Sequence, residues 1–408
     1  MNKTDELKYT IDSLCLYNVG ADSVLQRLRA LLDGAATEQV FALYSAFFRA
    51  LGAAGGALKT HISELLVTDN NVFTAAAAGG KADRLPASVK AALRSDLQNL
   101  EALAALTKQD ILDAASPALR EALALLPEWE TGDAVPPLTE NWASQTEALT
   151  AFHRTYGYGI FVRHTAFLWR DGGLAPVKEP DPIRLTDLKR YESQRQQVVN
   201  NTLAFLNGRP ANNMLLYGDR GTGKSSTVHA VLNEYGSRGL RMIEIAKGDI
   251  GALNLIRETV ASSPMKFIIF IDDLSFDSHE DSFAQLKALL EGSLSGRQGN
   301  LLLYATSNRR HLIKESFADR ENDVHRGDTM QEELSLSDRF GLAVYFMNPD
   351  KAEYLDIVKR IAADRGLAVP AETLEQEAEL WARRRGGRSP RCARQFIDYL
   401  EGTAPTAG

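Results

Sequence analysis

The sequence predicts an α/β fold, in which a parallel sheet flanked by helices follows an α-helical region and precedes a small helical C-terminal domain. The Gly-rich segment GDRGTGKS (residues 218–225) stands between an apolar, strand-like run and a helix-forming stretch. From about residue 180 onward, short apolar runs alternate with helical segments, whereas residues 6–126 carry Ala and Leu at helical spacing. Alternating strands and helices are typical of a parallel sheet covered by helices.

The N-terminal region is expected to be helical because its apolar residues recur one helical turn apart. Val40 and Tyr44, for example, lie four positions apart on one predicted helix face. We expect these apolar stripes to form the region's own core rather than a groove for a partner. Residues 128–137 combine Pro, Gly and acidic residues and are expected to be a linker. Residues 156–169 suggest a small strand pair or an irregular bridge.

The region after residue 180 is expected to contain five parallel strands with helices between them. The candidate strands are residues 214–217, 241–246, 266–271, 301–306 and 343–347. After Pro349 the pattern returns to helices. The predicted domains are an α-helical N-terminal domain (1–135), a linker or bridge (136–180), an α/β core that contains the Gly-rich segment (181–348) and a helical domain (349–408).

Charge and composition restrict the class of protein. The 408-residue chain has a net charge of −7, and its first 150 residues hold 12 Lys and Arg against 19 Asp and Glu. An acidic N-terminal region beside a neutral remainder argues against a large nonspecific nucleic-acid surface, although local basic patches are not excluded. The two cysteines suit a reducing compartment. Because no signal peptide or membrane helix is predicted, we expect a cytoplasmic protein.

The segment GDRGTGKS has the form of a phosphate-binding P-loop. Gly218, Gly221 and Gly223 allow backbone N–H groups to turn toward an anion, and the following helix adds its positive N-terminal end. Lys224 would supply a charge for the β- and γ-phosphates, and the Ser225 hydroxyl would be a ligand for Mg²⁺. A purely structural turn is the alternative, but such a turn does not require the Lys-Ser pair.

Polar residues follow two of the predicted buried strands. The run KFIIFIDDL ends in two acids, of which Asp272 is the candidate ligand of Mg²⁺ and Asp273 the candidate that orients and deprotonates water. Asn308 ends the run LLLYATSN and could position that water against the γ-phosphate if its strand lies between the other two. The alternatives are acids that cap a solvated strand end and an Asn that serves only a turn.

These segments together resemble the AAA+ ATPases, with GDRGTGKS as Walker A, FIIFIDD as Walker B and ATSN as the first sensor. More closely, the runs IDDLSFD, YATSNRRHL, LSDRFGL and GRSPRCARQF resemble the bacterial AAA+ proteins called domain-of-unknown-function family 815, over about residues 150–402. The resemblance implies ATP as the ligand and a five-stranded core with a helical lid.

The resemblance also implies roles for residues outside the P-loop. Residues 181–194 are similar to the segment that packs on adenine, and Tyr191 within it joins the expected ATP-binding residues, as do Thr222 and Ser226. Arg339, in LSLSDRFG, corresponds to an arginine finger that reaches the nucleotide of a neighbouring subunit. The alternative for Arg339 is a salt bridge with a nearby acid.

The start of the last predicted helix indicates an anion site. Ser389 suits an N-cap and Pro390 the first helical position, so Arg391 falls in the first turn, where a cation opposes the helix dipole. A bound phosphate would relieve this unfavourable interaction. We therefore expect Arg391 to contact ATP, with Arg394 in reserve. A solvated basic patch is the alternative.

The expected function is slow, Mg²⁺-dependent ATP hydrolysis that drives a conformational change on a macromolecular partner, recruited through the N-terminal helical domain. Asp273 stands where many AAA+ motors have Glu, which favours slow turnover. An ATP-dependent homo-oligomer is expected, and nucleic acid is not indicated as the partner. The alternatives are an ATP-sensing adaptor or loader-like module with little turnover and, with less support, a small-molecule kinase. The polar segment 314–337 is expected to adjust Arg339.

Overall fold

A computed structural model of the chain describes residues 3–275, 285–287, 290, 299–308 and 339–403. The chain falls into two compact units. The first is Met1–Arg163 with Ser262–Met265, and the second is His164–Ala261 with Lys266–Gly408. The finer division into four domains stays a prediction.

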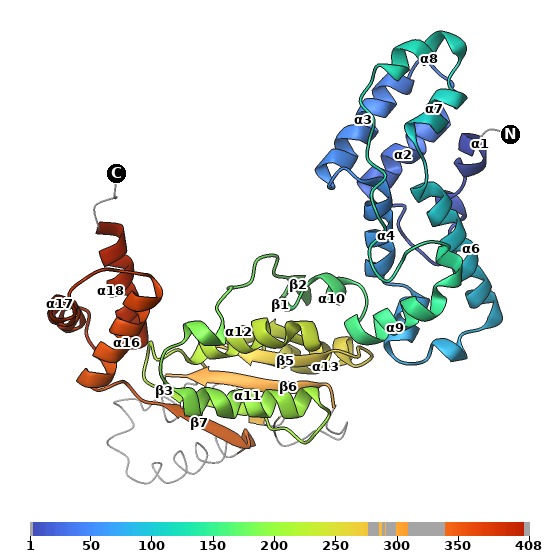
Figure 1. The fold of residues 1–408 in the computed structure, drawn as a ribbon. Coiled ribbons are helices and arrows are strands. Elements are labelled where there is room, and N and C mark those ends of the chain that lie inside the picture. The colour runs from blue at the N-terminus through green and yellow to red at the C-terminus, as the bar shows by residue number, and fades with distance from the viewer. Residues whose placement is uncertain (1–2, 276–284, 288–289, 291–298, 309–338, 404–408) are drawn as a thin grey trace. The chain divides into compact units, whose positions relative to one another are not determined.

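The first unit is α-helical, as expected (Figure 1). Its helices are α1 (Lys3–Leu7), α2 (Ser23–Gly34), α3 (Val40–Ala53), α4 (Leu58–Thr68), α5 (Val72–Ala78), α6 (Ala87–Ala104), α7 (Lys108–Ala114), α8 (Pro117–Ala124), α9 (Thr146–Tyr156) and α10 (Ile160–Arg163). Helix α3 buries the predicted stripe, including Val40 and Tyr44, in one apolar core. Asp22 caps α2 by accepting hydrogen bonds from the N–H groups of Val24 and Leu25.

The stretch expected to be a linker contributes to this helical core. Trp129 of this stretch is buried, and its ring packs edge-on against Phe47 with the two centroids 5.1 Å apart; Trp142, which follows the stretch, is buried as well. The backbone N–H of Leu58 also donates to the carbonyl of Glu130 over 2.9 Å. The Pro and Gly content of this stretch therefore reflects an irregular path over the helices, and large aromatic residues hold the stretch in place.

The second unit is built on one sheet with the strand order β2-β1-β4-β5-β6-β3-β7. Its strands are β1 (Ala166–Arg170), β2 (Gly173–Pro176), β3 (Met214–Gly218), β4 (Leu240–Glu244), β5 (Lys266–Ile271), β6 (Leu301–Ser307) and β7 (Leu342–Phe346). Neighbours are parallel except β1 and β2. The predicted α/β fold is confirmed, and β6 lies between β5 and β3, which is the condition on which the role considered for Asn308 depends.

The predicted strand count of five was wrong, since the sheet has seven strands among the described residues. The additional pair is a hairpin whose turn contains Asp171 and Gly172, both at positive φ. β1 joins the sheet beside β4, with Ala166 opposite Met242, and buries Phe167. The sequence suggested a strand pair near this position, but not that it would extend the main sheet.

Helices α11 (Glu192–Leu206), α12 (Lys224–Tyr235) and α13 (Leu253–Val260) accompany the sheet. Val198 of α11 and Val231 of α12 belong to one apolar core with strand residues such as Met214 and Phe270. Because the strands are parallel, the loops after β3, β5 and β6 emerge at the same edge of the sheet.

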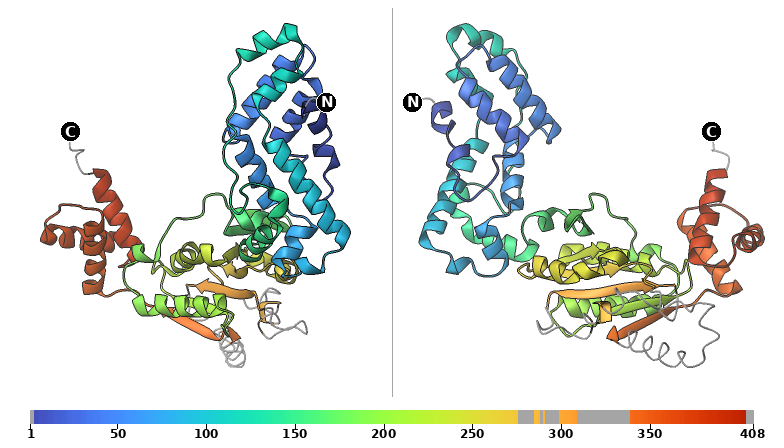
Figure 2. Two further views of the ribbon diagram at one scale, coloured as in Figure 1. Left: turned by 45° about the vertical axis from the view of Figure 1, so that its right-hand side comes forward. Right: turned by 180° about the vertical axis from the view of Figure 1, so that it is seen from behind.

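The last three helices are α16 (Lys351–Asp364), α17 (Ala371–Arg384) and α18 (Pro390–Thr403), drawn in red in Figure 2. They form a small bundle with its own apolar core, which we call the lid. Helix α18 begins as predicted: Pro390 is its first residue, and the N–H of Cys392 donates to the Ser389 hydroxyl over 3.1 Å. Phe396 lies on the buried face of this helix.

Short 3-10 turns complete the described chain, at Ile11–Ser13, Ala82–Arg84, Trp142–Ser144, Leu185–Asp187, Gly236–Arg238 and Lys247–Ala252. None of the helices in the described ranges combines the length and apolar character that a membrane-spanning helix needs.

Candidate functional site

The P-loop connects the end of β3 to the start of α12. Its glycines Gly218, Gly221 and Gly223 all have positive φ, which side chains with a Cβ rarely adopt. At Gly218 a Cβ would also lie 2.1 Å from the carbonyl oxygen of Phe346 on β7. Gly218 is therefore required by the packing of β3 against β7, in addition to the phosphate cradle expected from the sequence.

Lys224 is buried at the centre of the loop. Its Nζ donates to the carbonyls of Gly218 and Asp219, over 3.0 and 2.7 Å, and to Oδ1 of Asn308 over 3.1 Å. Burial lowers the pKa of the Lys224 ammonium to about 8. A phosphate would offer this ammonium charged acceptors, which form stronger hydrogen bonds than the neutral oxygens it now contacts.

The two acids after β5 face different partners. Asp272 accepts a hydrogen bond at Oδ1 from the Ser225 hydroxyl over 2.6 Å. Asp273 lies at φ +51°, and its Oδ1 accepts from Nδ2 of Asn308 over 2.6 Å. Asn308 thus joins Asp273 to Lys224. The structure brings together all five of these predicted site residues at the carboxyl ends of β3, β5 and β6.

Ser225 and Asp272 fit a Mg²⁺ site. A hydroxyl and a carboxylate supply the hard oxygen ligands that this ion prefers. Within the described ranges, no three His, Cys, Asp or Glu side chains are grouped so that they could hold a metal ion by themselves. Mg²⁺ bound with nucleotide commonly uses only one or two protein carboxylates and takes its other ligands from phosphates and water.

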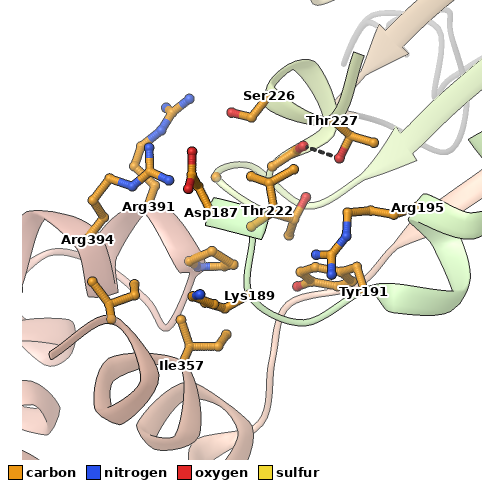
Figure 3. A pocket seen from close by; sticks show the side chains of 15 residues that line it. Asp187, Lys189, Tyr191, Arg195, Thr222, Ser226, Thr227, Ile357, Arg391 and Arg394 are labelled. Atoms are coloured by element: carbon orange, nitrogen blue, oxygen red, sulfur yellow. Dashed lines mark hydrogen bonds between the residues drawn. The ribbon is translucent and has the colours of Figure 1, made fainter. Parts of the chain in front are cut away.

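A cavity adjoins the P-loop between the core and the lid (Figure 3). Its lining comes from the segment before α11, the P-loop, the start of α12 and the lid. The lining residues are Asp187, Leu188, Lys189, Tyr191, Arg195, Gly221, Thr222, Gly223, Ser226, Thr227, Ile357, Ile361, Pro390, Arg391 and Arg394. The predicted ATP-binding residues Tyr191, Thr222, Ser226 and Arg391 all belong to this lining.

Tyr191 is held firmly in this wall. Its hydroxyl donates to the carbonyl of Met347 over 2.7 Å, and its ring packs on Phe346 at a centroid distance of 5.3 Å. Burial raises the pKa of the Tyr191 phenol to about 12. Arg190 and Tyr191 both have left-handed backbone conformations, so the chain turns sharply here before α11 starts at Glu192. The ring is therefore the part of Tyr191 that a ligand can contact.

The smaller P-loop side chains have separate roles. The Thr222 hydroxyl donates to the carbonyl of Asp219 over 2.8 Å and stabilises the loop itself. The carboxylate of Asp219 accepts the N–H of Asn348 over 2.6 Å, which connects the loop to the segment after β7. The Ser226 side chain extends toward the cavity in Figure 3.

The lid contacts the P-loop through its last helix. The backbone N–H of Arg391 donates to the carbonyl of Gly221 over 3.1 Å. The side chains of Arg391 and Arg394 both line the cavity, so either guanidinium is placed to contact a ligand there (Figure 3). Arg388, by contrast, is paired with Glu379, whose Oε2 lies 3.0 Å from the Arg388 Nε.

Arg339 lies at the opposite edge of the sheet. It lines a second cavity together with Asn213, Lys266 and Leu301, which stand at the amino ends of β3, β5 and β6. The structure therefore does not bring Arg339 to the P-loop of its own chain. The neighbouring segment 314–337, expected to adjust it, lies outside the described residues.

Sequence reasoning missed Thr306 of β6. Its hydroxyl donates to Oδ1 of Asp272 and accepts the backbone N–H of Asp273 over 2.9 Å. Thr306 stands two positions before Asn308 in the run ATSN, so a polar residue near the end of a buried strand was visible in the sequence. Its partners were not visible, because they follow a different strand, β5.

Solved structures with weak similarity include the Holliday junction branch migration motor RuvB of Thermotoga maritima and a variant of that same protein. Each is 17% identical over 54% of this chain and 65% of that chain, with a TM-score of 0.38. The chain thus spans about 65% of the length of these proteins. Likenesses of this size support no conclusion about function.

A search of curated proteins returned no similar sequence. The family described as "Protein of unknown function (DUF815)" matches residues 162–404, which is more than half of the chain and includes the P-loop, the acids after β5 and the lid. The chain belongs to this family.

Proposed function

We propose that the chain is a Mg²⁺-dependent ATPase that turns over slowly and uses ATP to change conformation on a macromolecular partner. The main support is one hydrogen-bonded network that joins the P-loop to β5 and β6. Lys224 contacts Asn308, Asn308 contacts Asp273, and Ser225 contacts Asp272. Phosphoryl transfer to water needs a cradle for the phosphates, a metal site and a group that orients the water, and this network offers all three.

The chain's own residues divide the task as follows. The P-loop N–H groups and Lys224 would bind the phosphates, while Ser225 and Asp272 would hold Mg²⁺. The bound ion would neutralise charge that develops on the phosphates. Asp273 orients the attacking water and accepts its proton, and Asn308, which contacts Asp273 in this structure, would position that water against the γ-phosphate.

Turnover is expected to be slow because Asp273 has a shorter side chain than Glu. A misplacement of about 1 Å between reacting groups can lower a rate on the order of 100-fold. In this structure the Asp273 carboxylate is hydrogen-bonded to Asn308 at 2.6 Å, so it must leave or share this contact to act on water. Such a site suits a switch better than a fast motor.

Hydrolysis is proposed to need a neighbouring copy of the chain. Arg339 lies at the amino ends of the strands, away from its own P-loop. A finger in that place can reach a nucleotide only if the nucleotide belongs to an adjoining subunit. We therefore propose an ATP-dependent homo-oligomer in which Arg339 stabilises transition-state charge in trans.

The conformational change is proposed to pass through the lid. The segment before α11 is tied to the lid by ion pairs of Lys189 with Asp364 and of Arg190 with Glu353. The N–H of Arg391 ties the lid to the P-loop at the Gly221 carbonyl. ATP in the cavity would contact the P-loop, this segment and the lid at once, so its arrival and hydrolysis would shift the lid. The N-terminal helical unit is the proposed site for the partner.

The test combines binding with hydrolysis. Binding of a fluorescent ATP analogue with Mg²⁺ is measured for the wild type, for Lys224→Ala and for Lys178→Ala, which removes an exposed lysine of the same unit as a control. We expect at least roughly a tenfold loss of affinity for Lys224→Ala and none for the control, because only Lys224 contacts the P-loop carbonyls. An equal affinity of all three proteins would contradict the proposal. Turnover at tens per second without a partner would contradict slow hydrolysis.

An ATP-sensing adaptor that barely hydrolyses ATP is the second candidate. A monomer favours this reading, because its own Arg339 lies away from its P-loop and no neighbouring subunit supplies another. Single-turnover hydrolysis with and without Arg339→Ala separates the candidates, since a pure sensor is indifferent to the loss of the finger. Capture of partners by Asp273→Asn loaded with ATP would then identify the macromolecule. Phosphorylation of an added metabolite would instead favour a kinase.

A further inference from the structure

Thr306, near the end of β6, contacts three consecutive residues of the neighbouring chain segment. The side chain is only 2% exposed. Its hydroxyl donates to Oδ1 of Asp272 and accepts the N–H of Asp273 over 2.9 Å, and its carbonyl accepts the N–H of Leu274 over 2.7 Å. A threonine hydroxyl has one proton, and a backbone N–H can only donate, so the proton of Thr306 is directed to the Asp272 carboxylate.

These contacts hold Asp273 in an unusual conformation. Asp273 lies at φ +51°, a left-handed conformation that residues with a Cβ seldom adopt. Such conformations persist only where the surrounding contacts enforce them, and they cluster at functional sites. Here the enforcing contacts are the hydrogen bonds on both sides of the turn, from the Asp273 N–H and the Leu274 N–H to Thr306.

The left-handed turn separates the two acids. Asp272 faces Ser225 at 2.6 Å, and Asp273 faces Asn308 at 2.6 Å. In an extended strand, successive side chains point to opposite faces of the sheet, so two adjacent acids could not both be presented at the strand end in this way. The turn allows one acid to face the metal ligand Ser225 and the other to face the residue that would position water.

We propose that Thr306 is a positioning residue of the site: its hydroxyl orients Asp272 as a ligand of Mg²⁺ and fixes the turn that places Asp273. This inference rests on the proposed function. Groups that hydrogen-bond to a metal ligand orient that ligand, and their loss typically weakens metal binding or activity about 10- to 100-fold. A threonine that served only packing would instead act through stability alone.

The test uses variants that separate the hydroxyl from the methyl group. Thr306→Val keeps the shape and removes the hydroxyl, whereas Thr306→Ser keeps the hydroxyl. Thr202→Val is the matched control, because Thr202 is also buried in this unit and its hydroxyl bonds to the Val198 carbonyl and the Tyr304 hydroxyl, each at 2.9 Å. Mn²⁺ binding in the presence of ADP is measured by electron paramagnetic resonance, together with metal-free ADP affinity, kcat and KM for ATP.

We expect Thr306→Val to bind Mn²⁺ with ADP about 10- to 100-fold more weakly and to lose kcat by a similar factor. Its metal-free ADP affinity should stay within about twofold of the wild type, because Thr306 does not line the nucleotide cavity. Thr306→Ser should restore both properties, and Thr202→Val should change neither. Should Thr306→Val not fold, Thr306→Cys replaces it, since a thiol is a weak donor and must show the same loss in the same direction.

Two negative results are distinguishable. A wild type that binds nucleotide and Mn²⁺, beside a Thr306→Val or Thr306→Cys variant with the same Mn²⁺ affinity and kcat, overturns the role of Thr306 and leaves the proposed ATPase intact. A wild type that binds neither ADP nor Mn²⁺ with ADP overturns the proposed function and this inference with it.

Discussion

Replacing Gly218 by Ala tests whether the start of the P-loop is fixed by the packing of β3 against β7. The added Cβ would lie 2.1 Å from the carbonyl oxygen of Phe346, whereas real contacts of a Cβ are essentially never under 3.0 Å. One of the two strands would therefore have to move by about 1 Å in a tightly packed sheet. That shift would also break the hydrogen bond from the Asp219 N–H to the same carbonyl, now 2.9 Å long.

The energetic cost has two sources besides the positive φ of Gly218. Forcing extra volume into a packed interior typically costs about 1–3 kcal/mol. Leaving a buried polar backbone group unpaired costs about 1–3 kcal/mol more. We therefore expect Gly218→Ala to lower the free energy of unfolding by about 2–6 kcal/mol beyond the backbone effect, and the melting temperature of this unit by on the order of 10 °C.

Gly208→Ala provides the matched control. Gly208 follows α11 at φ +69°, and no atom lies within 4 Å of the position of its Cβ. Gly208→Ala carries the conformational cost of about 1–2 kcal/mol for a residue with a Cβ in a left-handed conformation. The added Cβ would not clash with any neighbouring atom. Gly218 lies at φ +128°, farther from the left-handed α region than Gly208, so the difference between the two variants reports the clash with β7 together with this larger backbone cost.

The assay is thermal and guanidinium unfolding of the full chain without nucleotide, followed by circular dichroism. Working without nucleotide keeps ligand binding from adding to the measured stability. If Gly218→Ala unfolds within about 1 kcal/mol of Gly208→Ala, the contact with Phe346 does not constrain this glycine, and the reasoning fails.

Further predictions concern the arginines and the lid. Arg339→Ala should lower ATP turnover of the assembled protein by about 10³- to 10⁵-fold while leaving ATP affinity unchanged, as measured by phosphate release and equilibrium binding; an unchanged rate would remove its role in trans. Arg391→Ala and Arg394→Ala should differ in their affinity for ATP, measured by equilibrium binding, and the variant with the larger loss of affinity identifies the arginine that contacts phosphate. Equal, small losses of affinity would indicate that both arginines belong to a solvated patch. The hydrogen bond from Arg388 lowers the pKa of Glu379 below its ordinary value of 4.5. The ion pair of Arg388 with ionised Glu379 therefore stabilises the lid fully above pH 4.5, and this stabilisation is lost as the pH falls through the lower pKa of Glu379 in the folded state. Glu379→Gln should therefore make unfolding of the lid less sensitive to pH below 4.5, as measured by circular dichroism.

Much of the fold and the site could be predicted because the relevant residues are close in sequence. The P-loop glycines, Lys224 and Ser225 lie within eight consecutive positions, and the runs 266–271 and 301–306 are apolar segments followed directly or within two positions by a predicted site residue. Parallel strands bring these ends to one edge of a sheet, so the convergence of Asp272 and Asn308 followed from the strand assignment.

The features that escaped prediction depend on contacts between distant parts of the chain. The clash that excludes a side chain at Gly218 comes from Phe346 on the neighbouring strand. The extension of the sheet by β1 depends on its pairing with β4, where Ala166 lies opposite Met242. No local pattern around Gly218 or Ala166 encodes these partners, since propensity and periodicity describe only the segment itself.

The network around Lys224 suggests how the site could respond to ATP. Asn308 accepts from Lys224 through Oδ1 and donates to Asp273 through Nδ2, so one side chain joins the cation proposed to bind phosphate to the acid expected to act on water. A γ-phosphate would compete with Asn308 and with the loop carbonyls for the Lys224 ammonium, because charged acceptors form stronger hydrogen bonds. Once Lys224 turns to the phosphate, the Asn308 amide loses one of its partners and can reorient, and the contact that holds Asp273 weakens. Thr306 would keep the backbone of Asp273 in place during this exchange, since its hydrogen bonds reach the N–H groups of Asp273 and Leu274 and involve neither Lys224 nor Asn308. Binding of the nucleotide would thus release the Asp273 carboxylate while its backbone stays fixed.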